Sequence, residues 1–365
     1  MKKLIILFLF TLNLLITFAQ NDSSLINSNN EQEIKFSGYI ETYYSYDINN
    51  PSNHQKSNYI YSHNRTNEFN LNLGFIKAAY SSKKVKANLA LMAGTYSNAN
   101  LAAEDGVLKN IYEANIAVKL SKNSETYVET GVISSHIGFE SAISKDCWTL
   151  TRSIFAENSP YYECGIRLNH TSKNEKWFVS GLLLNGWQHI SRKDGNNALA
   201  LGHQLTWKPS EKVMINSSSF VGSYTPDTNR MMRYFHNFYG QFQVFKNVGL
   251  QIGLDYGIQQ KLKNSSSYSS WYAPVGILRI KASENINLSL RTEMYVDKDQ
   301  VMVTTGTTNG FQIAGISLGF DYKISENAVW RIEGRELAVK DQLFNLSNKS
   351  FGKNYTFTTS FAVSF

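Results

Sequence analysis

The sequence is poor in the residues that cross-link or interrupt a chain. Two cysteines in 365 residues exclude a disulfide-rich scaffold and a cysteine-rich zinc fold, and only five prolines interrupt the chain. Charged residues make up 18% of the chain, below the roughly 25% of a typical globular protein. After residue 19 no apolar run approaches the roughly 18 residues of a spanning helix. Any membrane that the mature chain crosses is therefore crossed by strands.

The composition that remains favours strands. Tyr and Phe number 21 each, and aromatic residues fit the pleated surface of a sheet. The formal net charge is +7, but the sequence contains no run of five Lys or Arg. We therefore predict no nucleic-acid partner.

The first residues read as an export signal. A Met-Lys-Lys start is followed by an apolar run from Leu4 to Phe18 and then by Ala19-Gln20. A basic start, an apolar stretch and a small residue before the break are typical of a cleaved secretory signal. We predict a signal peptide over residues 1–19. A membrane-anchor helix is the alternative, and the run is short for one.

Strict alternation of apolar and polar residues recurs along the rest of the chain. In residues 354–365 every second position from Tyr355 to Phe365 is aromatic or aliphatic except Thr359, and the positions between them are Asn, Thr, Ser and Ala. This period of two predicts β-strands. We identify about sixteen such segments. They start near residues 34, 68, 85, 111, 126, 161, 177, 198, 213, 234, 248, 271, 286, 310, 328 and 354. The segments at 177–190 and 213–221 alternate poorly.

The connections between the segments alternate between short turns and long loops. Seven short turns and eight long loops leave both termini on the short-turn side. Strands of this length, short turns at one end and long loops at the other are the plan of an outer-membrane barrel. We predict an all-β protein whose residues 34–365 form a transmembrane antiparallel β-barrel of about sixteen strands. Residues 20–33 would be a short N-terminal periplasmic segment, and the long loops would be extracellular.

One face of the strands carries charged residues, which we assign to the barrel interior. Sixteen strands leave room for an aqueous channel, so this assignment predicts a water-filled lumen. The predicted lumen-lining residues are Glu41, Glu113, Glu129, Arg167, Arg291, Glu293, Arg331, Glu333 and Arg335. Tyr44, Trp207, Trp330 and Phe365 fall on the opposite face and are predicted to contact lipid.

The third long loop, Ser134 to Pro160, is too long and too apolar for a solvated outer loop. We predict that it folds into the lumen and narrows it. A loop packed on the barrel rim is the alternative. An inward loop would place charges at a constriction, where rings of charge set selectivity. The predicted constriction residues are Glu140, Lys145, Asp146, Arg152 and Glu157.

Several stretches resemble those of a known family. They are Phe69 to Lys77, Leu108 to Asn115, His136 to Arg152, Glu157 to Glu163, Leu184 to Gln188, Arg233 to Asn237 and Trp330 to Arg335. Together they resemble the OmpL-like, β-barrel porin-2 type of outer-membrane porins over roughly residues 35–365. Lys145-Asp146-Cys147-Trp148 is the most specific part. The resemblance implies passive diffusion of small hydrophilic solutes across the outer membrane of a Gram-negative bacterium. It implies no particular solute and no binding residue.

The sequence contains no recognisable catalytic or metal-binding motif. The seven histidines lack close metal-ligand spacing, and no Gly-x-Ser-x-Gly or phosphate-binding loop is present. We therefore predict no enzyme activity and no cofactor, although pairs of His and Ser leave a barrel hydrolase open. Cys147 falls in the third loop and Cys164 on the lipid face of its strand, so we predict two free thiols.

Two functions remain in view. The first is a porin in contact with outer-membrane lipids and small hydrophilic solutes, forming a homotrimer by analogy with other sixteen-stranded porins. The second is a surface adhesin or receptor that acts through long loops such as Ile48 to Asn67, with its Tyr and His residues. The resemblance and the alternating last strand imply that Phe365 is an assembly signal for the outer-membrane insertion machinery.

Overall fold

The computed structural model describes residues 32–223, 225–346 and 349–365. The predicted signal peptide lies outside these residues and stays a prediction. The same holds for nearly all of the predicted segment 20–33. Among the described residues, no helix is long and apolar enough to span a membrane.

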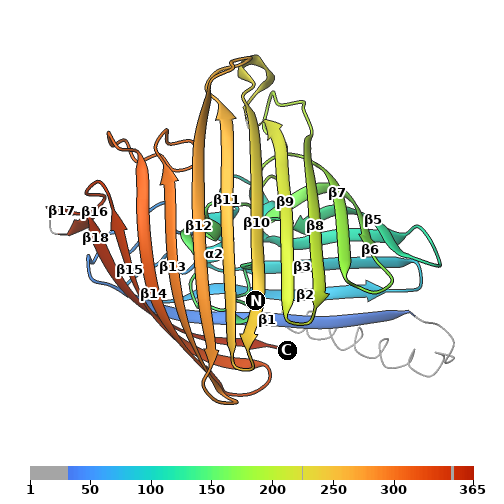
Figure 1. The fold of residues 1–365 in the computed structure, drawn as a ribbon, viewed down its shortest axis with the longest axis horizontal. Coiled ribbons are helices and arrows are strands. Elements are labelled where there is room, and N and C mark those ends of the chain that lie inside the picture. The colour runs from blue at the N-terminus through green and yellow to red at the C-terminus, as the bar shows by residue number, and fades with distance from the viewer. Residues whose placement is uncertain (1–31, 224, 347–348) are drawn as a thin grey trace, which may run out of the picture.

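Sixteen antiparallel strands close into a barrel, which Figure 1 shows with β8 to β14 toward the viewer. The predicted fold class is confirmed. The strands are β1 (Glu33–Asp47), β2 (Phe69–Ser81), β3 (Val85–Ala93), β4 (Ile111–Lys119), β5 (Glu125–Ser134), β6 (Tyr162–Thr171), β7 (Trp177–Leu184), β8 (Ala200–Ser210), β9 (Val213–Ser223), β10 (Met232–Phe245), β11 (Val248–Gln260), β12 (Tyr268–Lys281), β13 (Ile286–Asp297), β14 (Phe311–Lys323), β15 (Ala328–Val339) and β18 (Lys353–Ser364).

Short elements lie in the long loops. They are α2 (Thr95–Asn100), η2 (Gly106–Asn110), η3 (Ser144–Asp146), α3 (Ile154–Glu157), η4 (Asp227–Asn229) and the hairpin β16 (Phe344–Leu346) with β17 (Lys349–Phe351). The hairpin extends the last long loop and was not predicted. The fourth long loop also begins earlier than expected. Strand β7 ends at Leu184, because Gly186 takes a φ of 155° and the Asn185 side chain donates to Ile190 O.

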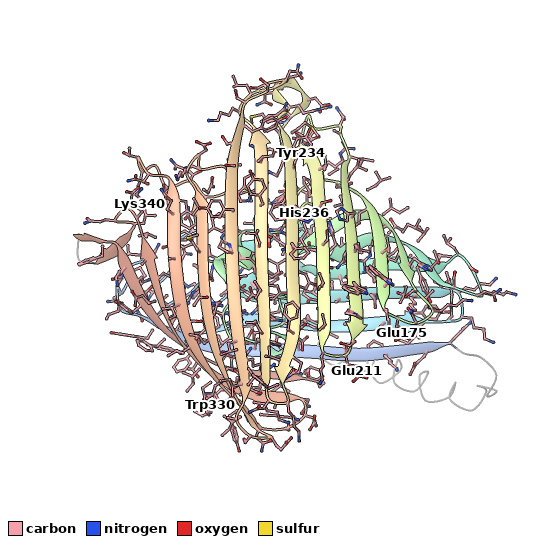
Figure 2. All side chains as sticks on the ribbon, in the orientation of Figure 1. Glu175, Glu211, Tyr234, His236, Trp330 and Lys340 are labelled. Atoms are coloured by element: carbon pink, nitrogen blue, oxygen red, sulfur yellow. The ribbon has the colours of Figure 1, made fainter. Side chains whose placement is uncertain are left out.

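Alternation places apolar side chains on the outer wall. Phe238, Leu254, Leu318 and Phe357 are exposed there, as a surface facing hydrocarbon requires. Tyr234 lies toward the long-loop end of the wall, whereas Glu175 and Glu211 lie at the short-turn end (Figure 2). The outer wall is therefore an apolar band with polar groups beyond it.

Serine side chains shape several of the short turns. Ser283 Oγ accepts hydrogen bonds from the backbone N–H groups of Asn285 and Ile286. Ser172 Oγ accepts one from the Trp177 N–H in the turn between β6 and β7. Such contacts hold the chain in a turn where the sheet hydrogen bonds end.

The barrel closes where the last strand meets the first. Phe365 and Gly38 exchange backbone hydrogen bonds of 2.7 and 3.0 Å, and β18 pairs with β1 from Tyr39↔Ser364 onward. A Cβ atom at position 38 would lie 2.4 Å from Cζ of Phe365, so the ring needs a glycine there. Closure leaves no free strand edge in the membrane.

The interior is not polar throughout, which corrects the expectation from the sequence. In β14, Ser317 and Asp321 face inward near the short-turn end, but Phe311 and Ile313 face inward near the long-loop end and are buried. In β15 the inward-facing Leu337 lies beyond Arg335 in the same way. Alternation separates two faces without fixing what each face contacts. The apolar inward residues pack on one another and on the loops that fold into the barrel.

Candidate functional site

The third long loop, residues 135–161, packs against the inward-facing side chains of the wall. Ile154 and Phe155 of α3 are fully buried in the main apolar cluster, together with Val275 and Ile277 of β12. An irregular loop inside a barrel has backbone groups that no sheet satisfies, so the wall has to supply their partners.

One set of these partners is centred on Glu333 of β15 and Arg291 of β13, whose side chains form a 2.7 Å ion pair that is almost fully buried. Glu333 accepts hydrogen bonds from the backbone N–H and the hydroxyl of Thr151, at 2.9 and 2.6 Å. Arg291 donates to Thr151 O at 2.6 Å and to Thr149 Oγ1 at 3.1 Å. The pair therefore holds the loop at Thr151.

Two further ion pairs of the wall hold the loop on either side of Thr151. Glu293 accepts from the Ile154 N–H at 2.7 Å and pairs with Arg335. Arg331 pairs with Asp321 and donates to the carbonyl oxygens of Ser144 and Cys147. Carboxylates and guanidinium groups thus satisfy both N–H and C=O groups of the loop.

Glycines on the inner face of β11 accommodate the aromatic residues of the loop. A Cβ atom at Gly249 would lie 2.5 Å from the Trp148 ring, and one at Gly253 would lie 2.8 Å from the Phe139 ring. The loop is therefore fixed to the wall by two aromatic contacts as well as by charge.

The predicted constriction residues divide into two groups. Glu140, Arg152 and Glu157 are buried and satisfy backbone or hydroxyl groups of the loops. Arg152, for example, donates to Ala142 O at 2.8 Å. Lys145 is half-buried and Asp146 is exposed, and both line a cavity of about 450 Å³ beside Phe365. The five side chains do not come together as one ring of charge.

The predicted lumen-lining residues also divide. Glu41, Arg291, Glu293, Arg331, Glu333 and Arg335 are buried. The expectation that they face water is wrong, because the inward loops cover them. Glu113, Glu129 and Arg167 retain 15%, 10% and 20% of their side-chain exposure, and they pair as Lys77–Glu113 and Arg167–Glu129. Of these predicted residues, Glu113 on β4 and Arg167 on β6 are therefore partly exposed and Glu129 is nearly buried. On the opposite side, Arg279 of β12 also keeps 31% of its side-chain exposure near the short-turn end.

The first long loop, residues 48–68, also folds inward. Its His63 pairs with Glu41 at 3.1 Å, and both side chains are fully buried. Burial lowers the pKa of His63, although Glu41 opposes this shift. Tyr59 and Ile60 are buried as well. The loop does not display these side chains on the surface, as an adhesive loop would.

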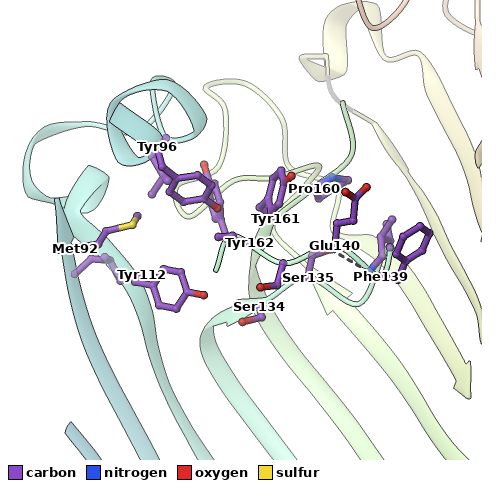
Figure 3. A pocket seen from close by; sticks show the side chains of 16 residues that line it. Met92, Tyr96, Tyr112, Ser134, Ser135, Phe139, Glu140, Pro160, Tyr161 and Tyr162 are labelled. Carbon is purple, nitrogen blue, oxygen red and sulfur yellow. Dashed lines mark hydrogen bonds between the residues drawn. The ribbon is translucent and has the colours of Figure 1, made fainter. Parts of the chain in front are cut away.

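Sequence reasoning missed a group of tyrosines beside the third loop. Tyr96, Tyr112, Tyr161 and Tyr162 line a cavity of about 150 Å³ between the loop and the wall. Figure 3 shows Tyr96 and Tyr112 on one side of this cavity and Glu140 on the other. The pairs Tyr96–Tyr161 and Phe75–Tyr112 are in ring contact. The only signal of this group in the sequence is the pair of adjacent tyrosines at 161 and 162.

Neither cysteine forms a disulfide in the structure. Cys147 is buried in the third loop, where its Sγ accepts from the Ser141 N–H, whereas Cys164 is half-buried on β6. Burial raises the pKa of the Cys147 thiol. Among the described residues, no group of three or more His, Cys, Asp or Glu side chains has the geometry of a metal site.

A comparison of the sequence with models of known protein families identifies the family of this chain. The sequence model of the family described as "Putative beta-barrel porin-2, OmpL-like" matches residues 33–365, which is nearly all of the chain. The chain belongs to this family of porins. The resemblance stated from the sequence is confirmed, and both the family and the fold are those of a channel rather than an enzyme.

Solved porin structures share the fold at low sequence identity. Salmonella typhi OmpF in complex with daunomycin is 8% identical, with a TM-score of 0.63 over 93% of this chain and 99% of that chain. The outer-membrane channel DcaP of Acinetobacter baumannii is 10% identical, with a TM-score of 0.62 over 93% and 99%. The anion-selective porin of Comamonas acidovorans is 10% identical, with a TM-score of 0.60 over 92% and 100%. A search of curated proteins finds no match.

These findings make the chain an outer-membrane porin of a Gram-negative bacterium. The porin is in contact with lipid on its outer wall and passes solutes through its interior. The roles of single residues in that interior are predictions, which the following experiments address.

Replacing Glu333 by Gln should destabilise the porin by about 3 kcal/mol, since breaking a buried pair leaves Arg291 without its closest counter-charge. The free energy of unfolding in lipid vesicles measures the effect. The matched control is Glu284→Gln, which breaks an exposed turn pair with Lys281 and should change nothing measurable. Equal effects of the two variants would contradict the account of the loop anchor.

The free energy of unfolding should also depend on pH through Glu157 of α3. Burial raises the pKa of Glu157 from 4.5 to about 7, and the N–H groups of Tyr61 and Ser62 oppose this only in part. A carboxyl whose pKa is raised on folding contributes stability below pH 4.5 and loses it as the pH rises through 7.

The free energy of unfolding of the wild type, minus that of the Glu157→Gln variant, should therefore fall by about 3 kcal/mol between pH 4.5 and 7.5. This follows because each pKa unit corresponds to about 1.4 kcal/mol. Chemical unfolding of both proteins across this range measures the difference. A difference that stays constant with pH would show that Glu157 is not buried as the structure places it.

Proposed function

We propose that the third long loop is the constriction of this porin, and that small hydrophilic solutes pass on the side of the lumen lined by β2 to β6. The opposite side, from β12 to β15, is closed by α3 and by the ion pairs that hold Thr151 and Ile154. The single observation that carries the proposal is this division of the inward-facing charges. Those that hold Thr151 and Ile154 are buried, whereas Glu113 on β4 and Arg167 on β6 are partly exposed.

The charges on the proposed path are paired with one another. Lys77 lies 2.6 Å from Glu113, and Arg167 lies 2.7 Å from Glu129. Each pair is close to neutral as a whole, so the path carries no excess of one sign. We infer weak selectivity between cations and anions, because selectivity by charge needs a ring of one sign.

The tyrosine-lined cavity is the narrow part of this path. Its volume of about 150 Å³ is room for a few water molecules. Tyr96 and Tyr162 are almost fully buried beside it. We infer that ions and small solutes pass here and that larger solutes are excluded.

The remaining functional assignments are proposals of the same kind. We propose export through a signal peptide over residues 1–19, assembly into a homo-oligomer of porin type such as a trimer, and no catalytic activity. We also propose that Lys145 and Asp146 contribute to the electric field at the periplasmic mouth, because they line the cavity beside Phe365.

Single-channel conductance in a planar bilayer tests the constriction. Deleting residues 139–153 should raise the conductance several-fold, because this removes the segment that fills the lumen. Tyr112→Ala should raise it by a smaller factor, because it enlarges the tyrosine-lined cavity. The matched control is Tyr295→Ala on β13, which lies on the closed side and should leave the conductance of folded protein unchanged.

A conductance unaffected by the deletion and by Tyr112→Ala would overturn the proposal. It would mean that the loop packs beside the conducting path without limiting it. A folded barrel that does not conduct even after the deletion would contradict solute passage on this side altogether. Heat modifiability on gels confirms that each variant is folded.

Phe365 is a proposed assembly signal, because the terminal ring is 64% exposed beyond its contact with Gly38. Phe365→Ala should lower the fraction of folded, heat-modifiable protein in cells and leave refolding into detergent nearly unchanged. The control is Val363→Ala, two residues earlier in β18. Equal losses in cells and in detergent would show a purely structural role, and unchanged assembly would remove the role entirely.

A further inference from the structure

A polar patch interrupts the apolar outer wall from β7 to β10. We define it as Gly181, His203, Ser217, Ser219 and His236. Strand pairing sets four of these residues in one row, Gly181↔His203, His203↔Ser219 and Ser219↔His236. Figure 2 shows His236 on the wall, below Tyr234. The patch belongs to the surface that faces outward, because the two histidines and Gly181 are exposed.

The patch lies within the apolar band. His203 sits between Leu201 and Leu205 on β8, and both leucines are exposed large hydrophobic residues. His236 sits between Tyr234 and Phe238 on β10, which are exposed as well. Apolar side chains therefore flank the patch on both sides along each strand. A water-exposed surface would not have this arrangement.

The polar atoms of the patch form a hydrogen-bonded group. Ser217 Oγ lies 3.3 Å from His203 Nε2 and 3.3 Å from His236 Nε2, and Ser219 Oγ contacts His203 Nδ1. Among the described residues, His236 Nδ1 has no hydrogen-bond partner. Polar groups facing hydrocarbon are costly unless a partner covers them.

We propose that a second copy of this chain covers the patch, so that copies of the porin meet along β7 to β10. This rests on the proposed homo-oligomer and names its contact face. Histidine and serine side chains each contain donors and acceptors, so the patch offers complementary groups to a like surface. Small residues allow two walls to approach closely, as at helix contacts within membranes.

Two features favour a copy over a lipid headgroup. The five patch residues include no Lys or Arg, which are the side chains that bind phosphate. A Cβ atom at Gly181 would also meet no heavy atom within 4 Å, so the space beside the histidines is open to a second surface. Hydrogen bonding and close packing would hold the contact.

Gly181 also provides the test. Gly181→Phe adds an apolar ring that fits this chain and lipid but separates the two walls. The matched control is Gly276→Phe on β12, where a Cβ atom has only an ordinary 3.5 Å contact with Thr292 Oγ1. Native mass spectrometry of protein in lipid nanodiscs counts the copies. We expect the oligomer for wild type and Gly276→Phe, and its loss for Gly181→Phe.

A second variant keeps the test decisive if Gly181→Phe does not fold. His203→Leu combined with His236→Leu makes the patch apolar. Lipid contact predicts an unchanged oligomer for this double variant, whereas the proposed contact predicts dissociation. A monomeric wild type in nanodiscs, or Gly181→Phe and the double variant assembling like wild type, would overturn the proposal.

The test of the contact face does not depend on whether the third loop is the constriction of the channel. Gly181 faces outward, so the conductance of each Gly181→Phe barrel should equal that of a wild-type barrel. Loss of the oligomer with unchanged conductance per barrel supports the contact face whether or not the third loop limits flow.

Discussion

Irregular backbone inside a barrel has N–H and C=O groups that no helix or strand satisfies, and the rest of this interior depends on how they are satisfied. In this porin the partners are charged side chains of the wall. Glu333, Glu293 and Arg331 bind the backbone at Thr151, Ile154 and Cys147. Each of these three side chains is itself paired with an opposite charge, so none of the three is an isolated buried charge.

The same anchoring divides the lumen into two unlike sides. On the side of β12 to β15, apolar residues and ion pairs pack against α3 and close the interior. On the side of β2 to β6, charges keep part of their exposure and tyrosines line a cavity. A sixteen-stranded barrel would otherwise hold a wide channel. We propose that the third loop determines the size of the pore more than the number of strands does.

Alternation within strands and the lengths of the turns and loops were sufficient to predict the barrel, because both are local properties of the sequence. Residues 354–365 and 286–297, for example, show the period of two directly, and both are strands. Alternation did not predict the end of a strand where the backbone conformation of the following residues ends it. Strand β7 stops at Leu184, and Gly186 explains this only once its backbone angles are known.

The interior was harder to predict, because its contacts join residues that are far apart in sequence. Nothing in the sequence pairs Thr151 with Glu333, which lie 182 positions apart. The charges at Arg291 and Glu333 were correctly placed on the inner face but wrongly expected to meet water. Trp271 and Phe311 were also not recognised as inward-facing apolar residues. An apolar face that packs on a loop and one that contacts lipid have the same alternating pattern in the sequence.

The central claim is that solutes pass on the β2–β6 side of the lumen and not on the β12–β15 side. The most direct test uses two variants, each with one introduced cysteine on one side of the lumen and with both native cysteines replaced. The current through single channels of each variant is measured. Asn169→Cys is on β6 beside Glu129, and Ser317→Cys is on β14 where the interior is closed. A charged, water-soluble thiol reagent should reduce the current through Asn169→Cys channels and leave Ser317→Cys channels unchanged. An equal reduction in both, or a reduction only in Ser317→Cys, would contradict the account.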